Sequence, residues 1–372
     1  MYFAYFIIPA LCMVPIGIYF YYYFKRAAAI FKVDTGHRAI RLLLALSSAV
    51  FVGFAMNIWG FWAVVVLYLF MFAIIMELLN ILVLKAIQVK RHKCWDKIYA
   101  SGVIPLVFTV IALGYGYLNM GNVVEKDYTV YTDKEIREEG YRVALVSDLH
   151  YGITLNKSQL EDKCAEIEAA QPDLVVLCGD IFDERTSKIQ MEEAVRIFGS
   201  IQSEFGTIYI YGNHDQASFS DKPNYTVQHL QQTILSENIR ILQDEQWKLN
   251  DEFVVIGRDD RRNPSGGERK SSRELAEGAD PEDFLLLLDH QPCELAENSE
   301  AGYDLQLSGH THGGQIWPMG FFNEYMGFGE INYGHRAIDG FQVIVSSGMA
   351  GWGYPVRTGS HSEYVIVDIL NN

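Results

Sequence analysis

The segment RVALVSDLH, residues 142–150, is the most informative about the fold. It reads as a buried β-strand that is followed by an aspartate and a histidine two positions apart. Two similar segments follow, DLVVLCGD at 173–180 and TIYIYGNHD at 207–215. Helical stretches at 157–169 and 188–204 separate the three strands. This alternation predicts parallel strands joined by right-handed crossovers. The polar residues then gather at the carboxyl ends of the strands, where open α/β sheets place their sites.

Two later strands end in histidines. FLLLLDH at 284–290 delivers His290, and DLQLSGHTHGGQ at 304–315 delivers His310 and His312. In both DLH and HTH the two polar residues are two apart, so strand alternation places them on one face of the chain. Asp, His and Asn side chains suit Mn, Fe or Zn ions, and the set lacks the thiolates of structural zinc sites and the all-oxygen shell of calcium sites. The sequence therefore predicts a transition-metal site at the strand ends.

Taken in order, the motifs D-x-H, G-D, G-N-H-D, a lone His and G-H-T-H resemble the calcineurin-like metallophosphoesterase family. The resemblance covers residue 142 to the end of the chain. The GHTHGGQ form of the last motif, together with the apolar segments before the first one, is similar to the membrane-associated bacterial branch of that family. The resemblance implies an α/β fold, a four-layer α/β/β/α sandwich, here preceded by a four-helix transmembrane domain.

The resemblance also assigns the metal ligands. It gives one ion to Asp148, His150, Asp180 and His312, and the other ion to Asp180, Asn213, His290 and His310. Asp180 is thus the expected bridge, since two neighbouring cations need a shared carboxylate to offset their repulsion. Two divalent ions, Mn, Fe or Zn, are expected to lower the pKa of a bridging water. Glycines at 179, 212 and 309 are expected to let the backbone turn sharply beside the ions.

His214 and Asp183 are the expected catalytic residues. His214 has no metal of its own in the family pattern, where this position contacts the phosphate and protonates the leaving oxygen. Asp183 matches a position that orients this histidine in phosphoprotein phosphatases of the family. The match is incomplete, because the chain reads GDIFDER where those enzymes have an arginine directly after that aspartate. Purple acid phosphatases have a tyrosine ligand at this place, and its absence favours two divalent ions.

Four apolar runs dominate the first third of the chain, and each approaches the roughly 20 residues that cross a bilayer as a helix. They lie at 2–24, 42–59, 61–83 and 98–118. The loops after the first and third runs are rich in Lys and Arg, so the positive-inside rule places both in the cytoplasm and the catalytic part outside. Glu77, the one acid well inside a run, is interpreted as facing the bundle and pairing with a loop lysine such as Lys85.

Charge divides the chain near Asn122. Residues 1–122 hold 10 Lys and Arg against 3 Asp and Glu, and the remainder holds 20 against 43, so the two net charges are +7 and −23. We therefore expect a membrane domain over 1–122, a linker over 123–140 and a metallophosphoesterase domain over 141–372. An acidic domain does not suit a nucleic-acid backbone as a partner.

The leading interpretation is hydrolysis of a phosphomonoester, phosphodiester or pyrophosphate by metal-activated water, on a substrate that is soluble, lipid-linked or membrane-proximal. The alternative is a non-catalytic receptor or scaffold that keeps the fold, and intact ligands at every position argue against it. Arg258, Arg261 and Arg262 are either surface residues or phosphate contacts, and Arg357 in the final loop is another candidate contact. The segment 319–333 is either a substrate-facing lid or a packed loop.

Overall fold

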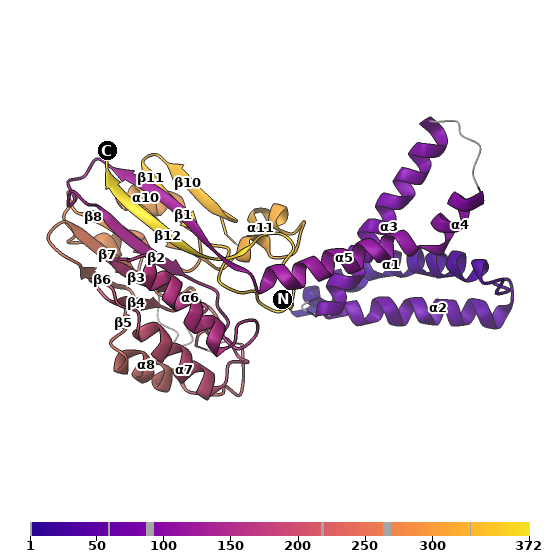
Figure 1. Cartoon of the computed structure of the whole chain (residues 1–372), viewed down its shortest axis with the longest axis horizontal. Helices are drawn as coiled ribbons and strands as arrows, with labels where there is room; N and C mark the ends of the chain where they lie inside the picture. Colours follow the sequence, from indigo (N-terminus) through magenta and orange to yellow (C-terminus); the bar gives the residue numbers. More distant parts are fainter. Residues whose placement is uncertain (1, 59, 87–92, 217–218, 263–268, 328) are drawn as a thin grey trace. The chain divides into compact units, whose positions relative to one another are not determined.

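The computed structural model contains two compact units, Met1–Gly116 and Tyr117–Asn372 (Figure 1). The described backbone covers residues 2–58, 60–86, 93–216, 219–262, 269–327 and 329–372. The described side chains are those of the same residues except 2–10, 83–86 and 93–94.

The first unit consists of helices. Their bounds are α1 Tyr2–Ile30, α2 Arg38–Gly53, the 3₁₀ helix η1 Phe54–Met56, α3 Phe61–Ala86, α4 Lys93–Ser101 and α5 Val103–Met120, whose last turn belongs to the second unit. Among the described residues, three helices are long and apolar enough to cross a membrane: Arg38–Met56, Phe61–Leu82 and Val103–Met120. The expected number of four spans is therefore corrected to three for this part of the chain.

Of the four expected spans, the first apolar run, 2–24, is the one that is not among these three helices. It forms a helix, but the side chains of residues 2–10 lie outside the described part. From Leu11 onward α1 contains several tyrosines and then Lys25 and Arg26. The described part of α1 is therefore not among the three helices that are long and apolar enough to cross a membrane.

The fourth apolar run becomes helical as two pieces. Gly102 separates α4 from α5 and has a φ of +68°, a conformation that favours glycine. The Tyr23 hydroxyl donates a hydrogen bond to the Gly102 carbonyl over 2.6 Å and ties α1 to this break. The span is consequently Val103–Met120 and begins later than the expected 98–118.

Glu77 of α3 faces the other helices of its unit, as expected, and its described ion-pair partner is Arg26 of α1. Arg26 Nη1 lies 2.7 Å from Glu77 Oε1. The hydroxyls of Tyr19 and Tyr99 also donate to this carboxylate. The side chain of Lys85, the partner suggested by the sequence, lies outside the described residues. The contacts join α1, α3 and α4, which is the usual way to hold a charge inside a helical bundle.

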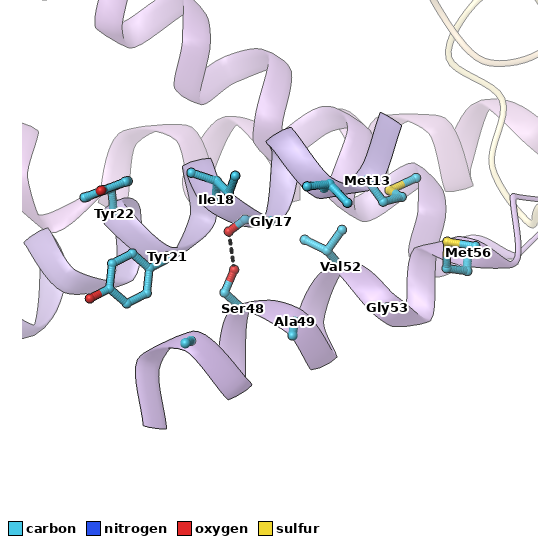
Figure 2. Close-up of a pocket in the computed structure, with 12 residues that line it drawn as sticks. Met13, Gly17, Ile18, Tyr21, Tyr22, Ser48, Ala49, Val52, Gly53 and Met56 are labelled. Atoms are coloured by element: carbon cyan, nitrogen blue, oxygen red, sulfur yellow. Dashed lines mark hydrogen bonds between the residues drawn. The ribbon is translucent and has the colours of Figure 1, made fainter. Parts of the chain in front are cut away.

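Helices α1 and α2 pack together and leave an apolar groove of about 590 Å³ between them (Figure 2). Small residues such as Gly17 and Ala49 line it, and Ser48 Oγ donates to the Gly17 carbonyl over 2.5 Å. Small residues and hydroxyl contacts are typical of closely packed membrane helices. All the lining residues belong to the first unit.

The second unit contains two six-stranded sheets, with the strand orders β1-β12-β2-β3-β4-β5 and β10-β11-β9-β8-β7-β6. The strands are β1 Val123–Thr132, β2 Tyr141–Val146, β3 Leu174–Cys178, β4 Thr207–Ile210, β5 Arg240–Ile241, β6 Glu245–Lys248, β7 Phe253–Gly257, β8 Phe284–Leu288, β9 Leu305–Ser308, β10 Gly334–Ile338, β11 Phe341–Val345 and β12 Ser362–Asn371. The helices are α6 Lys157–Ala169, α7 Lys188–Gly199, α8 Val227–Ser236, α9 Ser272–Ala276, α10 Leu295–Glu300, η2 His312–Gly314 and α11 Gly320–Met326.

Alternate side chains of each strand face opposite layers. In β2, Leu145 enters the core between the sheets, where it joins residues such as Leu286 of β8, whereas Val146 faces the helices. Helices α6, α7 and α8 cover the outer face of the first sheet (Figure 1). Leu275 of α9 and Leu295 of α10 pack in the apolar cluster on the outer face of the second sheet. The expected four-layer α/β/β/α sandwich is confirmed.

The expected linker contains a strand. Residues 123–132 form β1, which pairs in parallel with β12 from Val123 opposite Ser362 to Thr132 opposite Asn371. The sequence VVEKDYTVYT has charged residues at its centre and so lacks the apolar run of the other strands. As the edge strand of its sheet, β1 tolerates these exposed charges, which also discourage pairing with other chains.

Candidate metal centre

The seven predicted ligands follow five strands and converge at one end of the sandwich. In the first sheet Asp148 and His150 follow β2, Asp180 follows β3 and Asn213 follows β4; in the second sheet His290 follows β8, and His310 and His312 follow β9. Strands β2, β3 and β4 are parallel neighbours, and so are β8 and β9. Their carboxyl ends therefore meet, as expected for a site in an α/β protein.

The ligand atoms form two groups. Those of Asp148, His150 and His312 lie within 4.8 Å of one another, and those of Asp180, His290 and His310 do the same. Ligands about 2.0–2.2 Å from a shared ion are separated by distances of this order. Each group is a subset of one of the two ligand sets expected from the resemblance.

Asp180 lies between the two groups. Its Oδ2 is 3.2 Å from His290 Nε2 in one group and 3.9 Å from His150 Nε2 in the other. Its Oδ1 accepts a hydrogen bond from the backbone N–H of His214 over 2.8 Å. One carboxylate thus faces ligands of both groups, which is the position that a bridging ligand requires.

Several buried ligand atoms have no hydrogen-bond partner among the described residues. They are both ring nitrogens of His150, Nε2 of His290, Nδ1 of His312 and Oδ1 of Asn213. Buried polar atoms are rarely left in this state. The Nδ1–H of His290 donates to the Cys178 carbonyl over 2.8 Å, which leaves Nε2 as the electron-pair donor toward the site. The donor set therefore fits metal ions.

Backbone strain is concentrated at the same residues. Positive φ angles between 42° and 71° occur at Asp148, His150, Asp180, His310 and His312. Such conformations cost roughly 1–3 kcal/mol each outside glycine and cluster at functional sites. Here they turn each side chain into the site directly after a strand ends.

Two of the motif glycines make room for carboxylates. A Cβ atom on Gly212 would collide with the Asp180 carboxylate, and one on Gly309 would collide with that of Asp148. The glycines were expected to let the backbone turn sharply beside the ions. At these two positions the nearby space is filled by the carboxylates of two predicted ligands.

Asp215, the last residue of the GNHD segment, holds two ligand loops together. This fully buried carboxylate accepts hydrogen bonds from the backbone N–H groups of Asp180 (2.8 Å), Phe182 (3.0 Å) and Gly212 (2.6 Å) and from the Tyr209 hydroxyl (2.7 Å). Burial and the Asp180 charge raise the pKa of Asp215, and these donors act in the opposite direction. The sequence motif contains Asp215 but does not reveal this role.

His214 lies beside the ligand groups, and the carboxylate that holds it is Glu184. The Nδ1 atom of His214 is 3.0 Å from Glu184 Oε1 and 3.1 Å from Oε2. The rings of Phe219 and Trp352 lie 4.7 Å and 5.1 Å from the imidazole ring. Burial acts to lower the pKa of His214, but the carboxylates of Asp180 and Glu184 raise it overall.

Asp183 has a different position from the expected one. Its Oδ1 accepts from the backbone N–H groups of Arg185 and Thr186 over 2.8 Å and 3.2 Å, which closes a turn. Its Oδ2 lies 3.9 Å from Nδ1 of His150. The expectation that Asp183 orients His214 is therefore corrected. Asp183 lies close to His150, and the residue after it, Glu184, contacts His214.

Arg258 and Arg261, which follow β7, form ion pairs with acidic side chains. Arg258 is buried and lies 2.6 Å from Glu294 and 3.5 Å from Asp289. Arg261 also contacts Glu294. Burial acts to raise the pKa of Glu294, but the arginines lower it to about 2. Arg258 therefore has a structural role. It is not the surface residue or the phosphate contact that the sequence suggested.

The side chain of Arg357 also forms hydrogen bonds within the protein. It is fully buried and donates to the carbonyls of His312 and Ser347 over 3.1 Å and 2.8 Å, which ties the final loop to the metal-ligand loop. Burial lowers the pKa of Arg357 to about 10. The guanidinium group of Arg262 lies 5.0 Å from the ring centroid of Phe219, and Phe219 contacts His214.

The chain has relatives among known proteins. Residues 141–314 match the family described as calcineurin-like phosphoesterase. A "Transmembrane protein with metallophosphoesterase domain" from Bos taurus is 28% identical over 239 residues, which are 60% of this chain and 51% of that protein. Its namesake from Danio rerio is 26% identical over 319 residues, 82% of this chain and 70% of that protein. A metallophosphoesterase from Campylobacter jejuni is 26% identical over 291 residues, 76% and 74% of the two chains. This chain thus spans about half the length of the bovine relative.

Proposed function

We propose that this chain is a metal-dependent phosphoester hydrolase that works at a dinuclear metal centre while anchored in a membrane. The match of residues 141–314 to the calcineurin-like phosphoesterase family supports this proposal. The proposed reaction is the hydrolysis of a phosphomonoester, phosphodiester or pyrophosphate.

The observation that carries the proposal is the pair of ligand groups that share Asp180. Each set contains a buried carboxylate, a buried imidazole and a half-buried imidazole, and unpartnered nitrogens occur in both sets. A single structural metal would need one such set, and a core without metal would leave the buried nitrogens unsatisfied. Two ions explain both the number and the arrangement of the ligands.

The protein's own residues bind and position. Asp148, His150, Asp180 and His312 would hold one ion, and Asp180, Asn213, His290 and His310 would hold the other. Two divalent ions among Mn, Fe and Zn would activate water as the nucleophile and offset the charge of the phosphoryl oxygens. Asp180 keeps the two positions together, and Asp215 keeps the Asp180 and Asn213 loops in register through its hydrogen bonds.

His214 is the proposed general acid. Glu184 holds Nδ1 of its ring, so Nε2 is the nitrogen left to deliver a proton to the leaving oxygen. The position supports this role, because His214 adjoins Asn213 and its backbone N–H is bonded to the bridging Asp180. The rings of Phe219 and Trp352 lie close to the imidazole ring.

The membrane side of the hydrolase follows from the basic segments around the helices. Positive charges precede α2 and lie between α3 and α5, and the positive-inside rule puts both segments in the cytoplasm. Helices α2, α3 and α5 then cross outward, inward and outward. The second unit would then lie outside the cytoplasm, whether or not α1 also crosses the membrane.

A substrate screen tests the proposed function. The full chain, purified in detergent and loaded with Mn, Fe or Zn, should hydrolyse p-nitrophenyl phosphate, bis-p-nitrophenyl phosphate, a nucleotide or a phospholipid. Chelation should abolish the activity, and re-addition of metal should restore it. His310→Ala serves as the matched site variant and should be inactive. Failure of a metal-loaded preparation on all these substrates would favour the receptor or scaffold alternative.

A further inference from the structure

An exposed apolar surface follows directly after the last metal-ligand loop. Helix α11 exposes four large side chains, and Tyr325 is 90% and Phe321 70% accessible. Together with Trp317 they form what we call the apolar patch: Trp317, Phe321, Phe322, Tyr325 and Met326. A concentration of large apolar side chains on a water-exposed unit marks an interaction surface.

The apolar patch is fixed to the metal centre. Asn323 of α11 donates from Nδ2 to the carbonyl of Thr311 over 3.3 Å, and Thr311 lies between the ligands His310 and His312. Close backbone packing adds a second attachment, since a Cβ atom on Gly314 would collide with Gly320 at the start of α11. The patch therefore keeps a constant position relative to the metal site.

The apolar patch is also fixed to the end of a membrane span. Asn119, in the last turn of α5, donates from Nδ2 to the carbonyls of Arg357 and Ser360 over 3.0 Å and 2.7 Å. Thr358, between those two residues, accepts a hydrogen bond at Oγ1 from the backbone N–H of Trp317 over 3.1 Å. All these residues belong to the second unit. One short loop thus contacts both the end of α5 and the start of the patch.

We propose that the apolar patch inserts into the interfacial layer of the bilayer in which α5 ends, and that the metal site acts on amphiphilic, phospholipid-type phosphoesters presented by that bilayer. This inference rests on the proposed function for its substrate, but not for the membrane contact. A helix apolar enough to span a membrane ends at Met120, so the loop bonded to Asn119 lies where the chain leaves the hydrocarbon. Trp, Tyr and Phe side chains are suited to that interface, because their rings are apolar and Trp and Tyr carry a polar atom.

The chemistry of α11 favours insertion over electrostatic attraction. Its sequence GFFNEYM contains one charged residue, Glu324, and no basic residue. Glu324 lies 3.6 Å from Arg336 of β10, an ion pair that offsets its charge. Binding should therefore not require anionic lipid and should resist salt, unlike the contact of a basic surface with a membrane.

A depth-dependent quenching experiment tests the contact. The full chain carrying Cys12→Ser and Cys94→Ser, so that the other native cysteines are buried ones, is reconstituted into phosphatidylcholine vesicles. A fluorophore on Tyr325→Cys should be quenched strongly by nitroxide-labelled lipid and weakly by a water-soluble quencher. The control is Ile189→Cys on α7, where the native side chain is 76% exposed on the same unit, and its fluorophore should show the reverse pattern.

Two results would overturn the membrane contact. Equal lipid quenching at positions 325 and 189 would show that the patch stays in water. Protection of position 325 from both quenchers would show that a protein surface, such as a second copy of the chain, covers it. Neither result depends on hydrolytic activity.

A ratio of activities tests the substrate class. The double variant with Phe321→Ser and Tyr325→Ser should lower hydrolysis of a phospholipid phosphoester in vesicles severalfold relative to hydrolysis of soluble p-nitrophenyl phosphate, and the control Ile189→Ser should keep the wild-type ratio. An unchanged ratio in the double variant would contradict the inference and leave the proposed function standing. Absence of both activities in the metal-loaded wild type would instead reject the proposed function.

Discussion

At the scale of the residue, the proposed proton delivery depends on a pair formed by His214 and Glu184. The carboxylate fixes one imidazole nitrogen, and the flanking rings of Phe219 and Trp352 leave the imidazole little freedom to rotate. A general acid contributes most when the leaving group is a poor one, because an alkoxide needs a proton and p-nitrophenolate barely does. The leaving group therefore reports on this pair separately from the metals.

Glu184→Gln should leave the metal content intact and lower turnover of an alkyl phosphate while affecting p-nitrophenyl phosphate little. His214→Ala should show the same pattern more strongly, within the roughly 10²–10⁴-fold that acid catalysis supplies. Turnover of both substrates and metal content are measured on the same preparations. Asp183→Asn is the control, since Asp183 contacts the turn behind His150 and should not change the dependence on the leaving group. Equal losses for both substrates would leave His214 and Glu184 as phosphate-binding residues.

The motifs could name the candidate metal ligands, but not whether Asp183 or Glu184 contacts His214. Asp148 through His312 could be named because each follows an apolar strand within a recognisable motif. GDIFDER lies in a turn without periodicity, so nothing in its spacing tells whether Asp183 or Glu184 reaches His214. The left-handed backbone at Asp180 turns the chain there, and the turn closed by Asp183 sends Glu184 toward the imidazole.

At the scale of the element, the site depends on how the loops after β3 and β4 are joined. Asp215 makes this connection, because it accepts from the loop that carries Asp180 and from the loop that carries Asn213. The strands themselves are rigid and buried, whereas the loops contain the strained ligand residues. The hydrogen bonds of one carboxylate thus help to offset the strain.

Asp215→Ala should destabilise the second unit by roughly 3–5 kcal/mol, because it leaves several buried donors unpaired. The expected result is a lower midpoint of thermal unfolding for the full chain in detergent, with a loss of bound metal at temperatures where the wild type keeps it. Asp127→Ala, at an exposed acid on β1, is the matched control and should unfold like the wild type. An unchanged midpoint for Asp215→Ala would contradict the structural role.

Buried strands were easier to predict from the sequence than edge strands and exposed helices. Five strands begin within one residue of the segments that were expected to form them: β2, β3, β4, β8 and β9. Strands that are buried on both faces have continuous apolar sequences, which makes them easy to recognise. Strand β1 was missed because an edge position permits charges in its centre. The apolar patch on α11 was left open between a lid and a packed loop, since aromatic residues are equally compatible with a core and with an interface until their exposure is known.

At the scale of the whole molecule, the chain joins a helical unit suited to a membrane to an acidic unit that contains the candidate metal centre. The correction from four spans to three does not change the proposed side of the hydrolase. That side depends on α2, α3 and α5 and on the basic segments beside them, and α1 decides only the side of the N-terminus.

Labelling of intact cells tests the topology. In a Cys12→Ser background, an impermeant maleimide should not react with Cys94, which lies in the second basic segment. Asp127→Cys should react, because position 127 is exposed on β1 of the second unit. Cys94 should become reactive once the membrane is permeabilised, which controls for burial of the thiol. Labelling of Cys94 in intact cells, with protection of position 127, would place the hydrolase in the cytoplasm.

The central claim is that Asp180 joins two metal ions in one hydrolytic centre, and metal content measured by elemental analysis on an active preparation tests it most directly. The account predicts close to two transition-metal ions per wild-type chain, and a loss from both positions in Asp180→Asn, together with the loss of hydrolysis. His312→Ala, which touches one ligand group, should retain close to one ion. Hydrolysis by a preparation that contains no metal, or full metal content in Asp180→Asn, would contradict the account.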